Sequence, residues 1–289
     1  MFVPGHNDHF LASAALSDAD VLLLDIEDSV QPIANKQVAR DKICEFVRNQ
    51  VPKRHLLFPR VNDRESGQLL KDVNQLSIDG IDGFMYPKSK SGEDVYFFDK
   101  LLETIEYEKG IPVGTFKIIP LIETTAAVLN AQEICQASNR VIAIAYGCED
   151  FIADLGGIHD AEGHSLFVPR AMIAMAAKAN GIVPIDTVHI HVHDLEDLER
   201  NLKVVRNFGF EGMLVLHPKE IPLVHQYFSP TEKEVAEARE MLSLYENAIR
   251  ENRGVVVKNG KFVGPPMVIS AKKLLHQNAI IERKMRDHT

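Results

Sequence analysis

The chain has 289 residues, of which 45% are hydrophobic and 25% charged, and its 32 basic and 41 acidic side chains give a net charge of −9. This composition is typical of a globular protein with a large core and excludes a largely disordered chain. The negative charge argues against a nucleic-acid-binding surface, since such surfaces neutralise phosphates with an excess of Lys and Arg. The length favours one (β/α)8 barrel of about 250 residues with a short appendage over two separate domains.

The three cysteines, Cys44, Cys135 and Cys148, predict reduced thiols and a cytoplasmic location. Their number is odd and their spacing is not that of a metal-binding motif, and free thiols are typical of a reducing compartment. The N-terminal residues show no basic region followed by an apolar one, and no window approaches about 18 uninterrupted apolar residues. We therefore expect neither secretion nor membrane spanning.

Short apolar runs recur along the chain, each followed by a segment with helical periodicity. They predict eight strands, at Phe2–Val3, Val21–Asp25, Leu56–Val61, Gly83–Tyr86, Lys117–Glu123, Val141–Tyr146, Pro184–Ile190 and Met213–His217. The segments between them predict helices at Asn35–Arg48, Ser66–Leu76, Glu93–Tyr107, Thr125–Cys135, Pro169–Asn180 and Asp194–Phe208. This alternation predicts an α/β fold, a (β/α)8 TIM barrel over residues 1–228. A doubly wound open sheet is the alternative, but no Gly-x-Gly-x-x-Gly motif follows a strand.

Residues 229–289 break this alternation. Thr231 starts a predicted helix that runs to about Asn252, Gly254–Val263 predicts a hairpin around Asn259-Gly260, and Met267–Met285 predicts a final amphipathic helix. About 60 residues cannot bury a core of their own. We therefore expect this C-terminal extension to pack on the barrel or on a neighbouring subunit of a homo-oligomer.

Acidic side chains end or follow three of the predicted strands, at the edge where a barrel holds its reactive groups. They are Asp25, Glu27, Asp28, Glu123, Glu149 and Asp150. So many carboxylates in one place would raise one another's pKa values unless a cation neutralised them. All-oxygen ligands favour Mg²⁺, or Mn²⁺, over zinc. Glu123 and Asp150 are the predicted metal ligands, and the alternative is that acidic residues after strands cap helices.

Three basic residues complete the predicted site. The planar guanidinium of Arg60 suits bidentate binding of a substrate carboxylate. The alternative is a structural salt bridge to Asp25 or Glu27, and the two roles are compatible. Lys36 and Arg40 lie four residues apart at the start of a predicted helix, where a phosphate could bind. The alternative for this pair is two solvated side chains.

Four histidines after the seventh and eighth strands offer a different site. His189, His191 and His193 alternate along an extended segment, which would let them point the same way and bind a metal. A solvated or partner-facing row of histidines is the favoured interpretation. We expect His217, before Pro218, to be structural, with substrate contact as the alternative.

Together these motifs resemble the citrate lyase β subunit-like family of the HpcH/HpaI aldolase superfamily. The resemblance covers residues 1–226, and its motifs fall in the family's order. They are Phe2-Val3-Pro4-Gly5, Leu24-Asp25-Ile26-Glu27-Asp28-Ser29-Val30, Pro59-Arg60-Val61-Asn62, Pro87-Lys88, Pro120-Leu121-Ile122-Glu123-Thr124, Gly147-Cys148-Glu149-Asp150-Phe151 and His217-Pro218.

The resemblance implies a Mg²⁺-dependent, usually trimeric barrel enzyme. Such enzymes make or break a carbon–carbon bond between an acyl thioester enolate and an α-keto acid, in citryl, citramalyl or malyl thioesters carried by CoA or an acyl carrier protein. The resemblance implies that Glu123 and Asp150 are the Mg²⁺ ligands and that, with Arg60, they also bind the keto acid. It implies that Arg60, Glu27 and Asp28 are catalytic residues. It also implies that Lys36 and Arg40 bind the carrier.

Two positions depart from the family pattern. Family members carry an Arg before the first strand, where this chain has only Met1, and an acid/base Asp after the Gly-Lys turn of the tail, where this chain has Gly264. A glycine cannot transfer a proton. A second hypothesis is therefore an accessory, non-catalytic subunit that binds a keto acid or thioester, and a metal-dependent hydrolase is a third.

Overall fold

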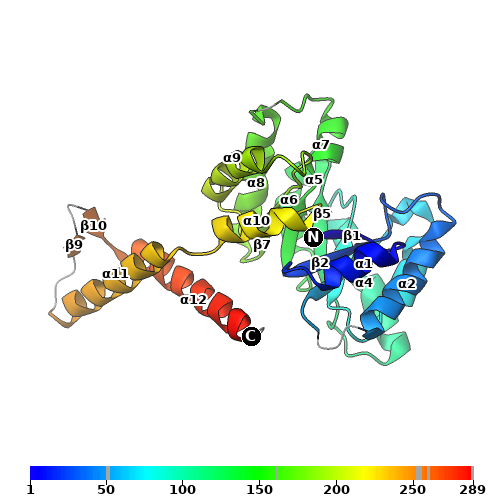
Figure 1. Ribbon diagram of the computed structural model, residues 1–289, viewed down its shortest axis with the longest axis horizontal. Helices are drawn as coiled ribbons and strands as arrows, with labels where there is room; N and C mark the ends of the chain where they lie inside the picture. The colour runs from blue at the N-terminus through cyan, green and yellow to red at the C-terminus, as the bar shows by residue number, and fades with distance from the viewer. Residues whose placement is uncertain (50–52, 161, 252–255, 259–260, 288–289) are drawn as a thin grey trace. The chain divides into compact units, whose positions relative to one another are not determined.

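The computed structural model describes residues 1–49, 53–160, 162–251, 256–258 and 261–287. Eight parallel strands form one curled sheet in which neighbours follow chain order, from β1 to β8 (Figure 1). Parallel neighbours require crossover connections, which explains the helix after each strand. The strands are β1 Phe2–Pro4, β2 Val21–Asp25, β3 Leu56–Arg60, β4 Gly83–Tyr86, β5 Lys117–Ile122, β6 Ala143–Tyr146, β7 Val183–Asp186 and β8 Gly212–Met213.

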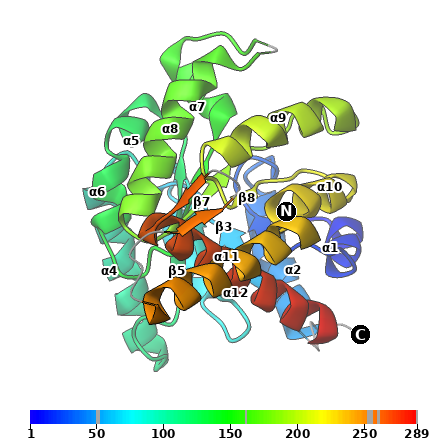
Figure 2. The same ribbon diagram turned by 90° about the vertical axis from the view of Figure 1, so that its left-hand side faces the viewer.

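Helices lie outside the sheet, and α5, α6 and α8 contact one another there (Figure 2). Ser91 caps α4 in a capping box with Asp94, and Thr124 caps α5, so both helices begin where the sequence supplies a hydroxyl. The helices up to the end of α10 are α1 Asp8–Ala15, α2 Asn35–Asn49, α3 Leu69–Leu76, α4 Gly92–Lys109, α5 Thr125–Leu129, α6 Ala131–Gln136, α7 Cys148–Leu155, α8 His164–Ala179, α9 Leu195–Asn207 and α10 Ile221–Phe228.

Apolar side chains at alternate strand positions form the core within the curled sheet. Leu23 of β2 is in register with Phe58 of β3, as Met85 of β4 is with Ile119 of β5. Successive side chains of a strand point to opposite faces, so one set fills the interior while the other meets the helices. The interior cluster comprises Leu23, Phe58, Met85, Ile119, Leu121, Ala143, Ala145 and Leu214.

The last two strands are shorter than the sequence predicts. β7 ends at Asp186 rather than at Ile190. β8 ends at Met213 rather than at His217, and the backbone N–H groups of Leu216 and His217 donate to the Glu220 carboxylate. The segments that leave the sheet early are those that carry the histidines.

Several helices differ from the prediction. The helix predicted over Thr125–Cys135 is broken at Asn130, whose side-chain amide donates to the carbonyl of Lys90. The short helices α1, α7 and α10 were not expected, and α8 begins before the predicted Pro169 start. Helices α1, α7 and α10 have only 8 residues each, too few for their periodicity to stand out.

Met1–Val224 and His225–Thr289 form two compact units. In the second, α11 (Glu232–Arg250) contacts α12 (Pro265–Asp287), and β9 (Val256–Lys258) pairs antiparallel with β10 (Lys261–Val263). The predicted turn at Asn259-Gly260 and the predicted helix end at Asn252 lie outside the described residues. No helix in the described part of the chain is long and apolar enough to cross a membrane.

Candidate active site

The predicted acidic and basic residues gather at the carboxyl ends of the strands. Asp25 and Arg60 are the last residues of β2 and β3 and are paired in register. Glu123 follows β5 directly, and Asp150 lies in the first turn of α7, after β6. Parallel strands in chain order thus bring residues from distant parts of the sequence to one edge of the sheet.

Arg60 forms a bidentate ion pair with Asp25. Its Nε and Nη2 donate to the two carboxylate oxygens at 2.7 and 2.8 Å, and Asp25 is only 1% exposed. Burial raises the pKa of Asp25, but the charge and hydrogen bonds of Arg60 outweigh burial, so the pKa lies below its usual range. The structural salt bridge considered for Arg60 is therefore present. Its third nitrogen, Nη1, lies 2.9 Å from Glu27 and remains on the site side.

Glu27 and Glu123 are buried carboxyls of the same site. Burial raises the pKa of Glu27 to about 7 against the charge of Arg60, and that of Glu123 to about 8 with Glu27 and Asp150 adding to the effect. The two oxygens of Glu27 lie 2.9 Å from Arg60 Nη1 and 3.1 Å from Lys88 Nζ. Two buried carboxyls with raised pKa values form an environment that a further cation would stabilise.

Lys88 joins these two carboxyls and was not among the predicted site residues. Its backbone N–H donates to Glu123 at 2.6 Å, and its ammonium lies 3.1 Å from Glu27. Its φ of 52° is left-handed, a conformation that no other non-glycine residue adopts in the described part of the chain. A strained backbone of this kind is common at functional sites. The motif Pro87-Lys88 at the end of a strand was the available signal.

Gly147 leaves room for the Glu123 side chain because it has no side chain of its own. A Cβ atom at this glycine would lie 2.8 Å from the Glu123 Cβ and 3.1 Å from its Oε2. Contacts closer than about 3.0 Å force a side chain to move, so position 147 admits only glycine without displacing the carboxylate. The sequence placed Gly147 in a motif but did not reveal this role.

The donor set fits a hard divalent cation. Carboxylates outnumber the cations Arg60, Lys88 and Lys36 around this edge. Mg²⁺ in proteins usually takes one or two carboxylates with water in the remaining positions. Glu123 and Asp150 supply such a pair, and the charge of Asp150 raises the Glu123 pKa. Within the described residues, neither residue belongs to a group of three potential ligand atoms that lie within 4.8 Å of one another.

Asp28 lies at the rim of this site. Its carboxylate is 3.5 Å from Arg60, and its side chain is 57% exposed, in contrast to the buried Glu27 beside it. The predicted catalytic pair thus consists of one buried and one solvated carboxylate. Glu27 is the buried member, and burial raises its pKa.

Lys36 and Arg40 do not face a free surface where a phosphate could bind. The Lys36 ammonium donates to the carbonyls of Ile26 and Glu27 at 2.8 and 2.6 Å, and only 5% of the residue is exposed. Arg40 is 1% exposed and pairs with Asp72 at 2.7 Å. Their positions argue against the expected carrier-binding role, because helical spacing places a side chain on a face without saying whether that face is covered.

The histidine row does not form one metal site. The rings of His189 and His191 lie 6.0 Å apart, whereas His193 lies 5.7 Å from His217. No potential metal-binding group among the described residues contains any of these four. His217 instead accepts a hydrogen bond from the backbone of Lys219 and caps a short 3₁₀ turn, the structural role expected of it.

The curled parallel sheet, with carboxylates and one arginine at its carboxyl edge, defines an α/β protein whose site suits an anionic substrate that chelates a metal. The chain belongs to the HpcH/HpaI aldolase/citrate lyase family, whose sequence model matches residues 1–218. This result confirms the family that the motifs indicated.

Individual relatives cover nearly the whole chain. It is 32% identical to the citrate lyase subunit beta of Leuconostoc mesenteroides subsp. cremoris, over 95% of this chain and 91% of that protein. It is also 32% identical to the L-malyl-CoA/beta-methylmalyl-CoA lyase of Cereibacter sphaeroides, over 97% and 94%. Among solved structures, protein CitE from Mycobacterium tuberculosis in complex with magnesium, acetoacetate and coenzyme A superimposes with a TM-score of 0.77 at 28% identity, over 96% of each chain.

Proposed function

We propose that this protein is a Mg²⁺-dependent carbon–carbon lyase, or catalyses the reverse condensation, on a short hydroxy-dicarboxylic acyl thioester such as a citryl, citramalyl or malyl thioester. The observation that carries the proposal is the buried pair Glu27 and Glu123, held with Arg60 and Lys88 at the carboxyl edge of the sheet. Its products would be an acetyl thioester and an α-keto acid.

The relatives support the substrate class. Both relatives are named for lyase reactions, and the CitE structure holds magnesium, a keto acid and coenzyme A together. The site of this chain offers matching chemistry, since it has oxygen donors for the metal and a guanidinium for the substrate. The carrier of the thioester would be CoA or an acyl carrier protein. We do not assign its binding to Lys36 and Arg40, because both side chains are buried and paired.

Arg60 and Lys88 are the groups that would stabilise negative charge on the substrate. Asp25 fixes the guanidinium plane by two hydrogen bonds, so Nη1 is held in place before a substrate arrives. A donor held in this way stabilises an oxygen that gains charge as the bond breaks. The Lys88 ammonium, on the other side of Glu27, supplies a second positive charge.

Glu123 and Asp150 would hold Mg²⁺, and the bound ion would supply Lewis-acid stabilisation of negative charge on the substrate. Glu27 is the carboxyl that would hold or release a proton, because its pKa of about 7 lies close to neutrality. This assignment gives the site an acid/base group although the tail position is Gly264.

Titration calorimetry tests the metal assignment directly. Mg²⁺ titrated in the presence of oxaloacetate or pyruvate should give one site, and Glu123→Gln and Asp150→Asn should each weaken it by about 10- to 100-fold or more. Glu149→Gln, next in sequence and 51% exposed at its side chain, is the matched control. Undiminished binding in both site variants would overturn the assignment.

An accessory subunit is the second candidate, and the observation that favours it is Gly264. This glycine directly precedes α12, and its carbonyl accepts from the backbone of Met267 and Val268. Turnover of citramalyl, malyl and citryl thioesters separates the candidates: a Mg²⁺-dependent rate abolished by Arg60→Ala would eliminate an accessory role. Thioester or keto-acid binding without turnover of any of the three would favour that role.

We further propose that the curled sheet closes into a (β/α)8 barrel and that residues 229–289 form an extension within a homotrimer. The backbone N–H of Phe2 donates to the carbonyl of Val215 at 3.0 Å, which links β1 to the segment after β8 and supports closure. Exposed apolar residues on α11 and α12 support a partner for the extension. They include Ile249, Ile269 and Ile280.

A further inference from the structure

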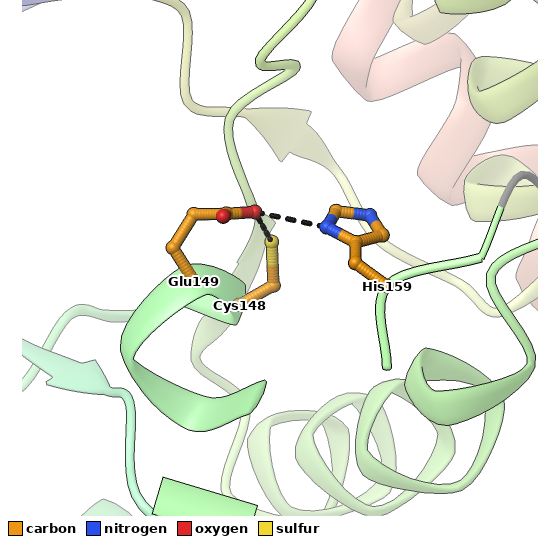
Figure 3. A group of neighbouring side chains, drawn as sticks. All are labelled: Cys148, Glu149 and His159. Carbon is orange, nitrogen blue, oxygen red and sulfur yellow. Dashed lines mark hydrogen bonds and ion pairs between the residues drawn. The ribbon is translucent and has the colours of Figure 1, made fainter. Parts of the chain in front are cut away.

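A second group of potential metal ligands lies at the start of α7, apart from the carboxylates assigned to Mg²⁺. Figure 3 shows Cys148, Glu149 and His159 directed toward one another, with dashed lines that join the Glu149 carboxylate to the thiol and to the imidazole. The Glu149 Oε1 atom lies 3.4 Å from the Cys148 sulfur and 3.0 Å from the His159 Nδ1. All three ligand atoms lie within 4.8 Å of one another.

The sulfur–oxygen and nitrogen–oxygen separations match those of a zinc centre. Bond lengths of about 2.3 Å to sulfur and about 2.0–2.1 Å to nitrogen or oxygen, at tetrahedral angles, place sulfur and oxygen about 3.5 Å apart and nitrogen and oxygen about 3.3 Å apart. The observed spacings differ from these values by only a few tenths of an ångström. A cation would need little movement of the side chains.

The donor types also differ from those of the Mg²⁺ site. A thiol and an imidazole are ligands for borderline or soft cations such as Zn²⁺, whereas Mg²⁺ prefers oxygen. Cys148 is 1% exposed, and its backbone N–H donates to the Thr187 hydroxyl, which fixes its position at the start of the helix. His159 and Glu149 come from the surface side, where a cation can enter.

A cavity of about 390 Å³ adjoins the group and contains an independent polar feature. Cys148 and His159 line it together with His189. His189 is 5% exposed, and its Nε2 makes no hydrogen bond, with the Asp197 carboxylate at 3.7 Å. A buried imidazole nitrogen without a hydrogen bond, in the cavity next to three potential ligands, indicates a ligand that the side chains alone do not supply.

We propose that Cys148, Glu149 and His159 bind one Zn²⁺ ion, with the fourth coordination position open toward the cavity that His189 lines. Binding forms the sulfur–zinc bond as the Cys148 thiol loses its proton to solvent, so charge and atoms balance. Three protein ligands and one open position are typical of zinc sites that accept water or a small anion. The ion would also tie His159, which follows α7, to the first turn of that helix.

Cobalt binding tests the proposal without any assay of lyase activity. Co²⁺ titrated into the metal-free full-length protein should give a sulfur-to-cobalt charge-transfer band that saturates at one equivalent, and Zn²⁺ should abolish it. Cys148→Ser should remove the band. His159→Ala changes an exposed side chain and removes a direct ligand. It should therefore weaken Co²⁺ binding by more than about 10- to 100-fold, which is the usual effect of losing a group that only orients a ligand.

Matched controls show whether the band comes from this group of ligands. Cys135→Ser removes another buried thiol, and His164→Ala disrupts the separate Asp160, Glu162 and His164 group, so both should leave the band unchanged. Saturating Mg²⁺ and Glu123→Gln should also leave it unchanged. No band, a band that persists in Cys148→Ser, or displacement of Co²⁺ by Mg²⁺ would overturn the proposal; circular dichroism verifies that each variant is folded.

Discussion

Arg60 neutralises a carboxylate that the fold buries almost completely, so its removal should affect stability as well as activity. Arg60→Ala leaves Asp25, 1% exposed, without its bidentate partner. Breaking a buried ion pair on one side costs about 3–5 kcal/mol, and we expect the free energy of unfolding to fall by that amount. Urea unfolding measures it.

The double variant Arg60→Ala/Asp25→Asn provides the control, because it removes the unpaired charge. It should recover a large part of the lost stability, while lyase turnover stays abolished. Equal destabilisation of the single and double variants would contradict the view that the stranded Asp25 charge is the cause.

The raised pKa of Glu123 makes stability depend on pH. The folded protein keeps the proton up to about pH 8, whereas an ordinary glutamate loses it near 4.5. Between these values the folded state binds more protons than the unfolded state, so this stabilisation is complete below pH 4.5 and is lost as pH rises through about 8. In EDTA, we expect the unfolding free energy to fall by up to about 1.4 kcal/mol per pH unit from this carboxyl.

Comparison with Glu123→Gln isolates this effect from every other titrating group. Unfolding curves at pH 5.5, 6.5 and 7.5 should show the wild type losing stability relative to the variant as pH rises. Because Mg²⁺ competes with the proton, its affinity in the wild type should increase over the same range. A wild-type minus variant difference that does not change with pH would show that Glu123 titrates normally.

At the scale of elements, the turn from β6 into α7 passes close to the end of β5. Gly147→Ala adds a methyl group 2.8 Å from the Glu123 Cβ, which displaces the carboxylate. We expect Mg²⁺ affinity to fall by about 10- to 100-fold, as for loss of other groups that orient ligands. Gly212→Ala, where nothing lies within 4 Å of the added carbon, is the control in calorimetry. Equal affinities in the two variants would show that Glu123 adapts.

Helix α2 is tied to the loop after β2 through Lys36. Lys36→Met removes two hydrogen bonds to the carbonyls of Ile26 and Glu27 and should lower the unfolding free energy by about 1–3 kcal/mol. CoA affinity, measured by calorimetry, should stay close to that of Lys42→Met, a control on the same helix whose partner is Asp8. A selective loss of CoA binding in Lys36→Met would restore the carrier-binding role that the sequence predicted.

For the whole molecule, the tail is expected to hold subunits together. Ile269, Ile280 and Met285 of α12 are each more than half exposed, an apolar surface that water disfavours. Deletion of residues 254–289 should reduce the proposed trimer to smaller species or cause aggregation, as light scattering would report, while Mg²⁺ binding persists. A soluble truncated protein that keeps its parent assembly would refute this role.

Gly264→Asp tests the remaining function of the tail. Aspartate is a favourable N-cap and should not destabilise α12, which begins at the next residue. An increase in turnover over the wild type would show that the tail lacks only a carboxylate. An unchanged rate agrees with Glu27 as the proton-transfer group, which Glu27→Gln should then abolish.

The sequence by itself determined the order of strands and helices, the family, and the acidic edge with Arg60. Alternating strands and amphipathic helices depend on local periodicity, and residues directly after strands meet at one edge in any parallel α/β sheet. For the same reason Glu123 and Asp150 could be assigned to neighbouring strand ends before their positions were known. Periodicity did not give the ends of β7 and β8; beyond β8, the backbone of Leu216 and His217 donates to the Glu220 side chain.

Only the tertiary structure decided which side chains are free to act. Lys36 and Arg40 have the spacing of a phosphate site, yet backbone carbonyls and Asp72 occupy their charges. Lys88 lies in the site because its backbone adopts a strained, left-handed conformation. Cys148 lies close to His159 because the loop after α7 returns to the start of that helix. Burial and pairing are properties of the assembled chain, because they depend on groups that are distant in sequence and share no local pattern.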